Sequence, residues 1–168
     1  MNSKTKRLAF LSVSVALSMI LSFVEAQIPP LSTVPGVKLG LANIVTVFLL
    51  YKLGFREACL VSVVRVGLSA LLFGSFVSLT YSVFGAAFSL VFMMAVKKLL
   101  PFSPIGVSVI GAIAHNAGQI LAAYIYLGNG AIVYYLIPLI ISGTVAGIFV
   151  GIAGGIVAQR INGRKTKK

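Results

Sequence analysis

The chain has 168 residues, of which 59% are hydrophobic and only 10% are charged, and its mean hydropathy is +1.08. Soluble domains carry charged side chains at roughly a quarter of their positions, so this composition excludes an ordinary soluble fold. The net charge of +12 would suggest nucleic acid in a soluble protein. Here the charges lie in clusters between long apolar runs, where they act as topology signals. We therefore expect a membrane protein that lies in the lipid bilayer and binds no nucleic acid.

Hydropathy and helix breakers divide the chain into six apolar segments, each predicted to be a transmembrane helix. The predicted spans are residues 8–24, 36–51, 58–73, 76–96, 105–127 and 131–157, followed by a basic tail at 158–168. The second span is the weakest, because its apolar run is only 13 residues long, from Leu39 to Tyr51, and roughly 20 are needed to cross the hydrocarbon. The expected fold is one compact all-α bundle of six transmembrane helices, residues 1–168, without a second domain.

Basic residues predict the orientation of this bundle, because cytoplasmic loops carry an excess of Lys and Arg. With the N-terminus inside, twelve of the fourteen basic residues fall on the cytoplasmic side. Lys38 lies outside and Arg65 lies within the membrane. This pattern predicts a multi-pass protein of the cell membrane with both termini cytoplasmic. A cleavable signal peptide is the alternative for residues 8–24, although seventeen apolar residues exceed its usual core of roughly 7–15.

Small residues recur every four positions on two of the predicted helices, a spacing that lets helix backbones approach closely in lipid. The sixth span carries three consecutive GxxxG units, formed by Gly143, Gly147, Gly151 and Gly155. We interpret this stripe as internal helix packing. The first span has two small faces, Ser14, Ser18 and Ser22 on one and Ser12 and Ala16 on the other. Two faces suggest one internal contact and one contact with a partner.

Arg65 is the most informative polar residue, because a central arginine costs about 2.5–3.5 kcal/mol on insertion scales unless something compensates it. The chain has only two acids, Glu25 and Glu57, at opposite ends of their spans. Neither acid is expected at the depth of Arg65. The charge of Arg65 is therefore expected to be compensated by amides, carbonyls, water or an anionic ligand. The alternative is a structural arginine whose side chain snorkels to the membrane surface.

The fifth span carries the densest polar face, which at about 100° per residue covers about a third of the helix circumference. It consists of Ser108, His115, Asn116, Gln119 and Tyr126. This face is predicted to look into the bundle, where it either binds a ligand or ion or makes internal hydrogen bonds. Pro138 is expected to kink the sixth span. The candidate substrate-binding residues are Lys38, Asn43, Arg65, Tyr81, His115, Asn116, Gln119 and Tyr126.

The residues that are absent restrict the reaction class. The chain has no Asp, no GxxxxGK[ST] phosphate loop and no HExxH zinc motif. A single His and two Glu do not build a convincing hydrolytic or metal site. We therefore expect no enzyme, no catalytic residue, no metal site and no cofactor, and any ATP-driven work needs another subunit.

The stretch from Pro35 to Asn43, PGVKLGLAN, is followed by an apolar run. It resembles the signature of a small membrane family catalogued as Gx transporters or as heptaprenyl diphosphate synthase component I, and the resemblance covers about residues 8–160. That family resembles in turn the S components of energy-coupling factor (ECF) transporters. These are compact six-helix proteins with both ends in the cytoplasm that capture vitamins, metals or related small molecules.

The resemblance implies an S component that binds substrate at the extracellular side, docks on a transmembrane T component and topples to release it, driven by two cytoplasmic ATPases. Ser12 and Ala16 would be the docking positions, although S components usually carry Ala-xxx-Ala where this chain has Ser-xxx-Ala. The loop before Lys38 would act as a gate.

Arg65 and Lys38 are cations without an obvious internal carboxylate as partner. We therefore hypothesise an anionic substrate, a vitamin-, flavin- or prenyl-like molecule. Two other readings stay open. The chain is either a non-catalytic membrane accessory of heptaprenyl diphosphate (menaquinone side chain) synthesis, or a self-sufficient small carrier or channel.

Overall fold

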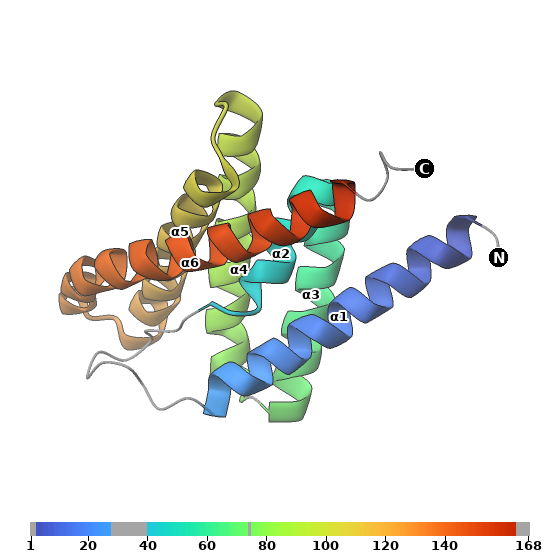
Figure 1. Ribbon diagram of the computed structural model, residues 1–168. Coiled ribbons are helices and arrows are strands. Elements are labelled where there is room, and N and C mark those ends of the chain that lie inside the picture. The colour runs from blue at the N-terminus through green and yellow to red at the C-terminus, as the bar shows by residue number, and fades with distance from the viewer. Residues whose placement is uncertain (1–2, 28–39, 74, 164–168) are drawn as a thin grey trace.

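The computed structural model of the protein describes residues 3–27, 40–73 and 75–163. These residues form six α-helices and one short 3-10 helix, η1, and contain no strand (Figure 1). The helices are α1 Ser3–Gln27, α2 Asn43–Lys52, α3 Phe55–Phe73, α4 Phe76–Leu99, α5 Pro104–Leu127, η1 Gly130–Tyr135 and α6 Leu136–Gly163. The all-helical fold predicted from the sequence is confirmed.

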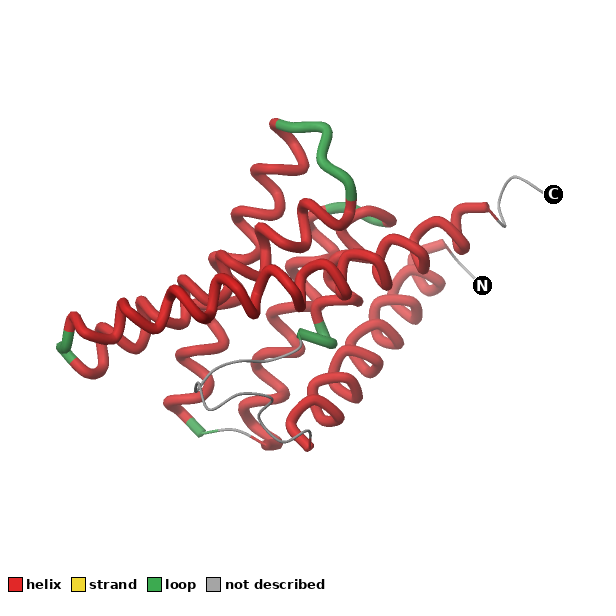
Figure 2. The backbone as a smooth tube through the Cα atoms, turned by 60° about the vertical axis from the view of Figure 1, so that its left-hand side comes forward, coloured by secondary structure: helices red, strands yellow, loops and turns green. Residues whose placement is uncertain are grey.

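Four stretches of helix are long and apolar enough to cross a membrane. They are Lys4–Glu25, Phe76–Leu99, Pro104–Leu127 and Gly130–Ile161. Helices of this length and composition are typical of a membrane protein. Helix α3 also has sufficient length at 19 residues, but it carries Arg56, Glu57 and Arg65. Figures 1 and 2 show that the beginning of α1 and the end of α6 lie toward the same side of the molecule.

Helix α2 differs most from the predicted span at 36–51. Residues 36–39 lie outside the described residues, and the helix begins only at Asn43. Gly40 has a left-handed φ of 71°, which glycine adopts without steric penalty and which does not continue a helix. The 10 residues of α2 measure about 15 Å, half of the roughly 30 Å of hydrocarbon. Helix α2 is therefore shorter than the span predicted at 36–51, and its ten residues would not cross the hydrocarbon by themselves.

The short α2 helix forms the centre of the hydrophobic core. Six consecutive residues, Val45 to Leu50, are buried, so α2 is covered on all sides, as expected of a helix that is apolar all round. Its side chains pack against buried residues of four other helices, α3 to α6. They also meet α1, where the rings of Phe10 and Phe48 lie 6.0 Å apart. A helix buried in this way need not reach both membrane surfaces.

Helices α5 and α6 approach each other closely along the glycine stripe. A Cβ atom added to Gly147 would lie 2.6 Å from the Cα of Val109, and one on Gly151 would lie 2.5 Å from the Cα of Ile105. Gly143 and Gly155 face Asn116 and Pro104 of the same partner helix. Because the atoms in the way at Gly147 and Gly151 are backbone atoms, a methyl group there would have to separate the two helices.

Helix α1 lies at the edge of the bundle and runs obliquely across α3 (Figure 1). It packs chiefly on α3 and, to a smaller extent, on α2. Ser14 and Ser18 are buried on its inner face, with exposures of 6% and 1%. Several large apolar side chains on its other faces are exposed, including Leu8, Val13 and Ile20. In this structure α1 is the most peripheral of the long helices.

The C-terminal part of the chain differs from prediction at both of its ends. The predicted span 131–157 begins as the 3-10 helix η1, and α6 starts only at Leu136. Pro138 thus lies in the first turn of α6, where backbone N–H groups have no partner within the helix in any case. Pro138 therefore removes no hydrogen bond of α6, and the reason for the kink expected near the outer third of the sixth span does not apply at this position. The predicted tail from 158 is also helical as far as Gly163, and residues 164–168 lie outside the described part.

We expect Gly147→Ala to lower the free energy of unfolding by about 1–3 kcal/mol, because the added methyl group overpacks the α5–α6 contact. Gly67→Ala is the matched control, since a Cβ there would meet nothing within 4 Å and should stabilise the helix by about 0.5–1 kcal/mol. Thermal unfolding of both variants in detergent, followed by circular dichroism, measures the difference. Equal effects would contradict this account of the glycine stripe.

Candidate functional site

Arg65 of α3 lies at the contact with α1. Most of its N–H donors have no hydrogen-bond partner among the described residues. Its Nη1 donates to the hydroxyl of Ser22 on α1 at 3.3 Å, a long hydrogen bond. Its Nε is buried and has no hydrogen-bond partner among the described residues, and the same is true of the Ser69 hydroxyl. Ser69 follows Arg65 by four residues, so both side chains lie on one face of α3. We call Ser22, Glu25, Gly40, Arg65 and Ser69 the Arg65 cluster.

Glu25 belongs to this cluster, contrary to the expectation that neither acid lies at the depth of Arg65. Its carboxylate interacts electrostatically with Arg65 and accepts a hydrogen bond from the backbone N–H of Gly40. The expectation failed because α1 extends to Gln27 and crosses α3 obliquely (Figure 1). The sequence-based estimate treated α1 and α3 as parallel helices, and an oblique crossing places Glu25 nearer to Arg65 than that estimate does.

The second acid, Glu57, contacts the other end of α1, near its N-terminus. It lies near the start of α3 with its side chain 8% exposed and forms a salt bridge with Arg7, whose side chain is 63% exposed. The chain has only two acidic residues. Both of them thus connect α1 with the remainder of the bundle, one near each end of the helix.

The polar face of α5 makes contacts in a different part of the bundle. Asn116 Nδ2 donates to the carbonyl of Leu139 on α6 at 2.7 Å. The His115 ring fills the space above Gly85 of α4, where an added Cβ would lie 2.7 Å from the ring. Gln119 is half-buried. Asn116 and His115 thus join α5 to α6 and to α4.

Two predicted tyrosines come together at one end of the α4–α5 pair. The rings of Tyr81 and Tyr126 are stacked, with centroids 6.2 Å apart and an interplanar angle of 9°. The hydroxyl of Tyr126 also shares a hydrogen bond of 3.1 Å with Thr80. Tyr126 is 46% exposed, so this aromatic pair lies at the surface rather than inside a closed cavity.

The eight candidate substrate-binding residues do not form one constellation. Within the described residues α3 packs on α1, α2 and α4, whereas α5 packs on α2, α4, η1 and α6. Arg65 and the α5 face therefore lie on helices that do not contact each other. Asn43 lies beside the Arg65 cluster, because its Nδ2 would be 3.5 Å from a Cβ on Gly40. Lys38 lies outside the described residues.

Ser22, Glu25 and Ser69 are the members of the Arg65 cluster that the sequence did not mark as candidates for binding. The spacing of Ser69, four residues after Arg65, was an available signal. No pattern in the sequence pointed to the approach of Glu25, which depends on how α1 crosses α3.

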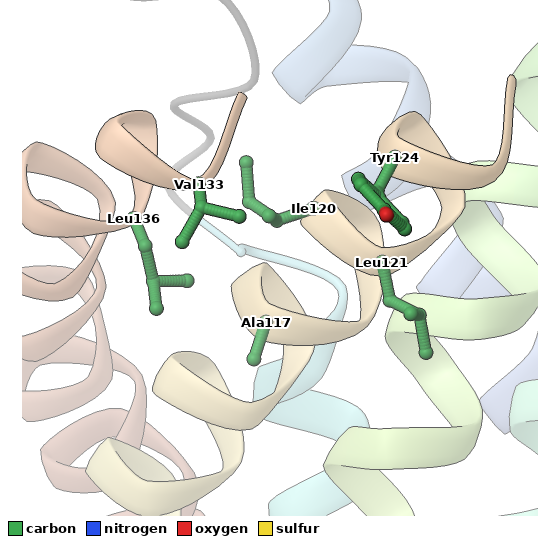
Figure 3. Close-up of a pocket in the computed structure, with 6 residues that line it drawn as sticks. All are labelled: Ala117, Ile120, Leu121, Tyr124, Val133 and Leu136. Atoms are coloured by element: carbon green, nitrogen blue, oxygen red, sulfur yellow. The ribbon is translucent and has the colours of Figure 1, made fainter. Parts of the chain in front are cut away.

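An apolar groove of about 240 Å³ lies between α5 and the η1–α6 connection. Figure 3 shows Val133 and Leu136 on one side of it and side chains of α5 on the other. Its lining residues are Ala117, Ile120, Leu121, Tyr124, Val133 and Leu136. None of the predicted binding residues lines this groove. Within residues 3–27, 40–73 and 75–163 there is also no group of three or more His, Cys, Asp or Glu side chains that would hold a metal ion.

The outward face of α1 presents two small residues between two large ones. Ser12 and Ala16 are exposed, and Leu8 and Ile20, four residues before and after them, are 66% and 58% exposed. The Ser12 hydroxyl donates to the carbonyl of Leu8 at 3.1 Å, which satisfies it within the helix. We call Leu8, Ser12, Ala16 and Ile20 the α1 outward stripe.

Together, the fold and these contacts define a small helical membrane protein with a partly buried arginine cluster and a peripheral first helix. The model of one protein family, heptaprenyl diphosphate synthase component I, matches residues 14–157. The chain therefore belongs to the heptaprenyl diphosphate synthase component I family. Comparisons with curated proteins and with solved structures gave no match.

We expect Asn116→Leu to lower the free energy of unfolding by about 0.6–1.7 kcal/mol, the usual range for one hydrogen bond between membrane helices. Gln119→Leu on the same helix is the control, because Gln119 makes no hydrogen bond within the described residues and should change stability less. Unfolding of both variants in mixed detergent micelles gives the comparison. An Asn116→Leu protein of unchanged stability would instead favour a direct role of this amide in binding.

Proposed function

We propose that the protein is the membrane-embedded, substrate-binding subunit of an ECF-type transporter for a small anionic vitamin-, flavin- or prenyl-like molecule. The observation that carries this proposal is the α1 outward stripe. Its two small residues allow close approach of another helix, while the opposite face of α1 is buried at Ser14 and Ser18. A helix with one face inside the bundle and one small-residue face outside is suited to docking a membrane partner.

The proposal assigns the remaining parts of the transporter to other chains. No nucleotide-binding motif is present in the sequence, so ATP hydrolysis would be supplied by cytoplasmic ATPase subunits acting through a transmembrane T component. The protein would lie in the cell membrane with both termini cytoplasmic, the orientation favoured by the distribution of Lys and Arg. It would bind its substrate without changing it chemically.

The family description supports a second candidate function. Membership in the heptaprenyl diphosphate synthase component I family favours a non-catalytic membrane accessory of heptaprenyl diphosphate synthesis. In this role the chain would bind a soluble prenyl synthase and present or remove a prenyl diphosphate at the membrane. Both candidates require a protein partner, and they differ in which partner it is.

We expect Ser12→Trp and Ala16→Trp to abolish co-purification of a T component and its ATPases, because a bulky ring separates the docking helices. Thermal stability should be unchanged, since both positions are exposed. Val63→Trp is the control, because Val63 on α3 is 63% exposed and lies outside the stripe. The measurement is affinity purification from the native membrane followed by mass spectrometry.

The same purification distinguishes the two candidate functions. A soluble prenyl synthase in place of transporter subunits would support the second function and refute the first. Retention of all transporter subunits by both tryptophan variants would show that the stripe is not the docking face.

A further inference from the structure

We propose that Arg65 and Ser69 form a binding site for an oxyanion, a phosphate, diphosphate or carboxylate group, and that Glu25 is the internal carboxylate with which this ligand competes. The site lies at the contact of α1 and α3, away from the polar face of α5. It rests on the proposed function in assuming an anionic substrate, and it places the anionic group of that substrate in the fold.

The donors available at this position match an oxyanion. Arg65 presents up to five N–H donors in a rigid fork that suits carboxylate and phosphate. Its only hydrogen bond within the described residues is the 3.3 Å contact with Ser22, and its buried Nε has none. The buried Ser69 hydroxyl, also without a partner, lies one turn along the same face. Buried donors left unpaired are unfavourable, so a ligand that pairs with both relieves a penalty present in the empty site.

The beginning of α2 adds positive potential beside this pair. No side chain caps it, and its first two backbone N–H groups, those of Asn43 and Ile44, donate to the carbonyls of Gly40 and Leu41. The aligned peptide dipoles still place a partial positive charge at the start of the helix. Gly40, two residues before Ala42, donates its backbone N–H to Glu25. Glu25 therefore contacts the turn that leads into α2 and also interacts with Arg65, and both neighbours favour a negative group.

Glu25 thus acts as the resident anion of the site. Its carboxylate acts on Arg65 electrostatically but forms no salt bridge with it among the described residues, so the N–H donors of Arg65 stay available. A phosphate or carboxylate that enters would compete with Glu25 for the guanidinium and would displace the weak bond to Ser22. Because Ser22 and Glu25 both belong to α1, ligand binding would loosen one end of the helix that carries the α1 outward stripe. Binding and docking are then thermodynamically linked, and each changes the affinity of the other by the same factor.

The test is the binding of inorganic diphosphate, inorganic phosphate and acetate to the full-length protein in nanodiscs of neutral lipid, measured by calorimetry. Arg65→Gln should weaken anion binding about tenfold or more, the effect of losing charge-assisted hydrogen bonds, and Ser69→Ala should weaken it about two- to tenfold. Ser89→Ala is the control, because Ser89 is a buried serine that lies on α4. It should bind the anions as the unmodified protein does.

Glu25→Gln gives the sharpest result, because the amide oxygen can still accept from Gly40 while the competing charge is removed. We expect this variant to bind anions more tightly and to gain more thermal stability from added diphosphate than the unmodified protein gains. A purely structural Arg65–Glu25 pair predicts no gain in affinity. Unchanged or weaker binding by Glu25→Gln would overturn the proposal, as would unchanged binding by Arg65→Gln. If Arg65→Gln does not fold, Ser69→Ala and Glu25→Gln decide the question.

A second arm separates a soluble ligand from a lipid headgroup. In nanodiscs containing phosphatidylglycerol, loss of diphosphate binding, together with phosphatidylglycerol that co-purifies with the unmodified protein but not with Arg65→Gln, would identify the lipid phosphate as the occupant of the same site. Absence of binding of every probe, lipid included, would refute the site. Co-purification of transporter subunits in the same preparations reports independently on the proposed function, so either hypothesis can fail while the other stands.

Discussion

Two carboxylates, the only acidic side chains of the sequence, attach the first helix to the rest of the bundle. Glu57 pairs with Arg7 at one end of α1, and Glu25 interacts with Arg65 and Gly40 at the other. Helices in lipid lack the hydrophobic drive that packs soluble helices. Polar contacts of this kind therefore carry a larger part of the work of holding a peripheral helix such as α1, whose large apolar side chains are mostly exposed.

The rest of the bundle is held in a different way. Helices α4, α5 and α6 approach through glycine, with backbone close to backbone at Gly118, Gly147 and Gly151, and α2 fills the centre with side chains buried on all sides. Close packing of this kind leaves little freedom to move. The molecule thus combines a tightly packed body with one helix attached by charges at its ends. That combination suits a subunit whose first helix meets a partner while its body stays unchanged.

The late start of α2 has a consequence for the site. Because the helix begins only at Asn43, the turn before it brings the backbone N–H of Gly40 to Glu25 of α1. A full-length second helix would have placed apolar side chains there. The shortness that made the second span weak on hydropathy is thus the feature that leaves room for Glu25 and Gly40 near Arg65.

The sequence by itself determined the helices and their type, because hydrophobic runs, helix breakers and GxxxG spacing are local properties read along one helix. It also indicated that Arg65 needs compensation, because the cost of a buried charge does not depend on the fold. Only the tertiary structure decided which groups lie near Arg65, that Asn116 bonds to α6, and that α2 begins only at Asn43. These outcomes depend on the tilt and axial shift of one helix against another, and a shift of one turn, about 5.4 Å, exchanges every side-chain partner at the contact.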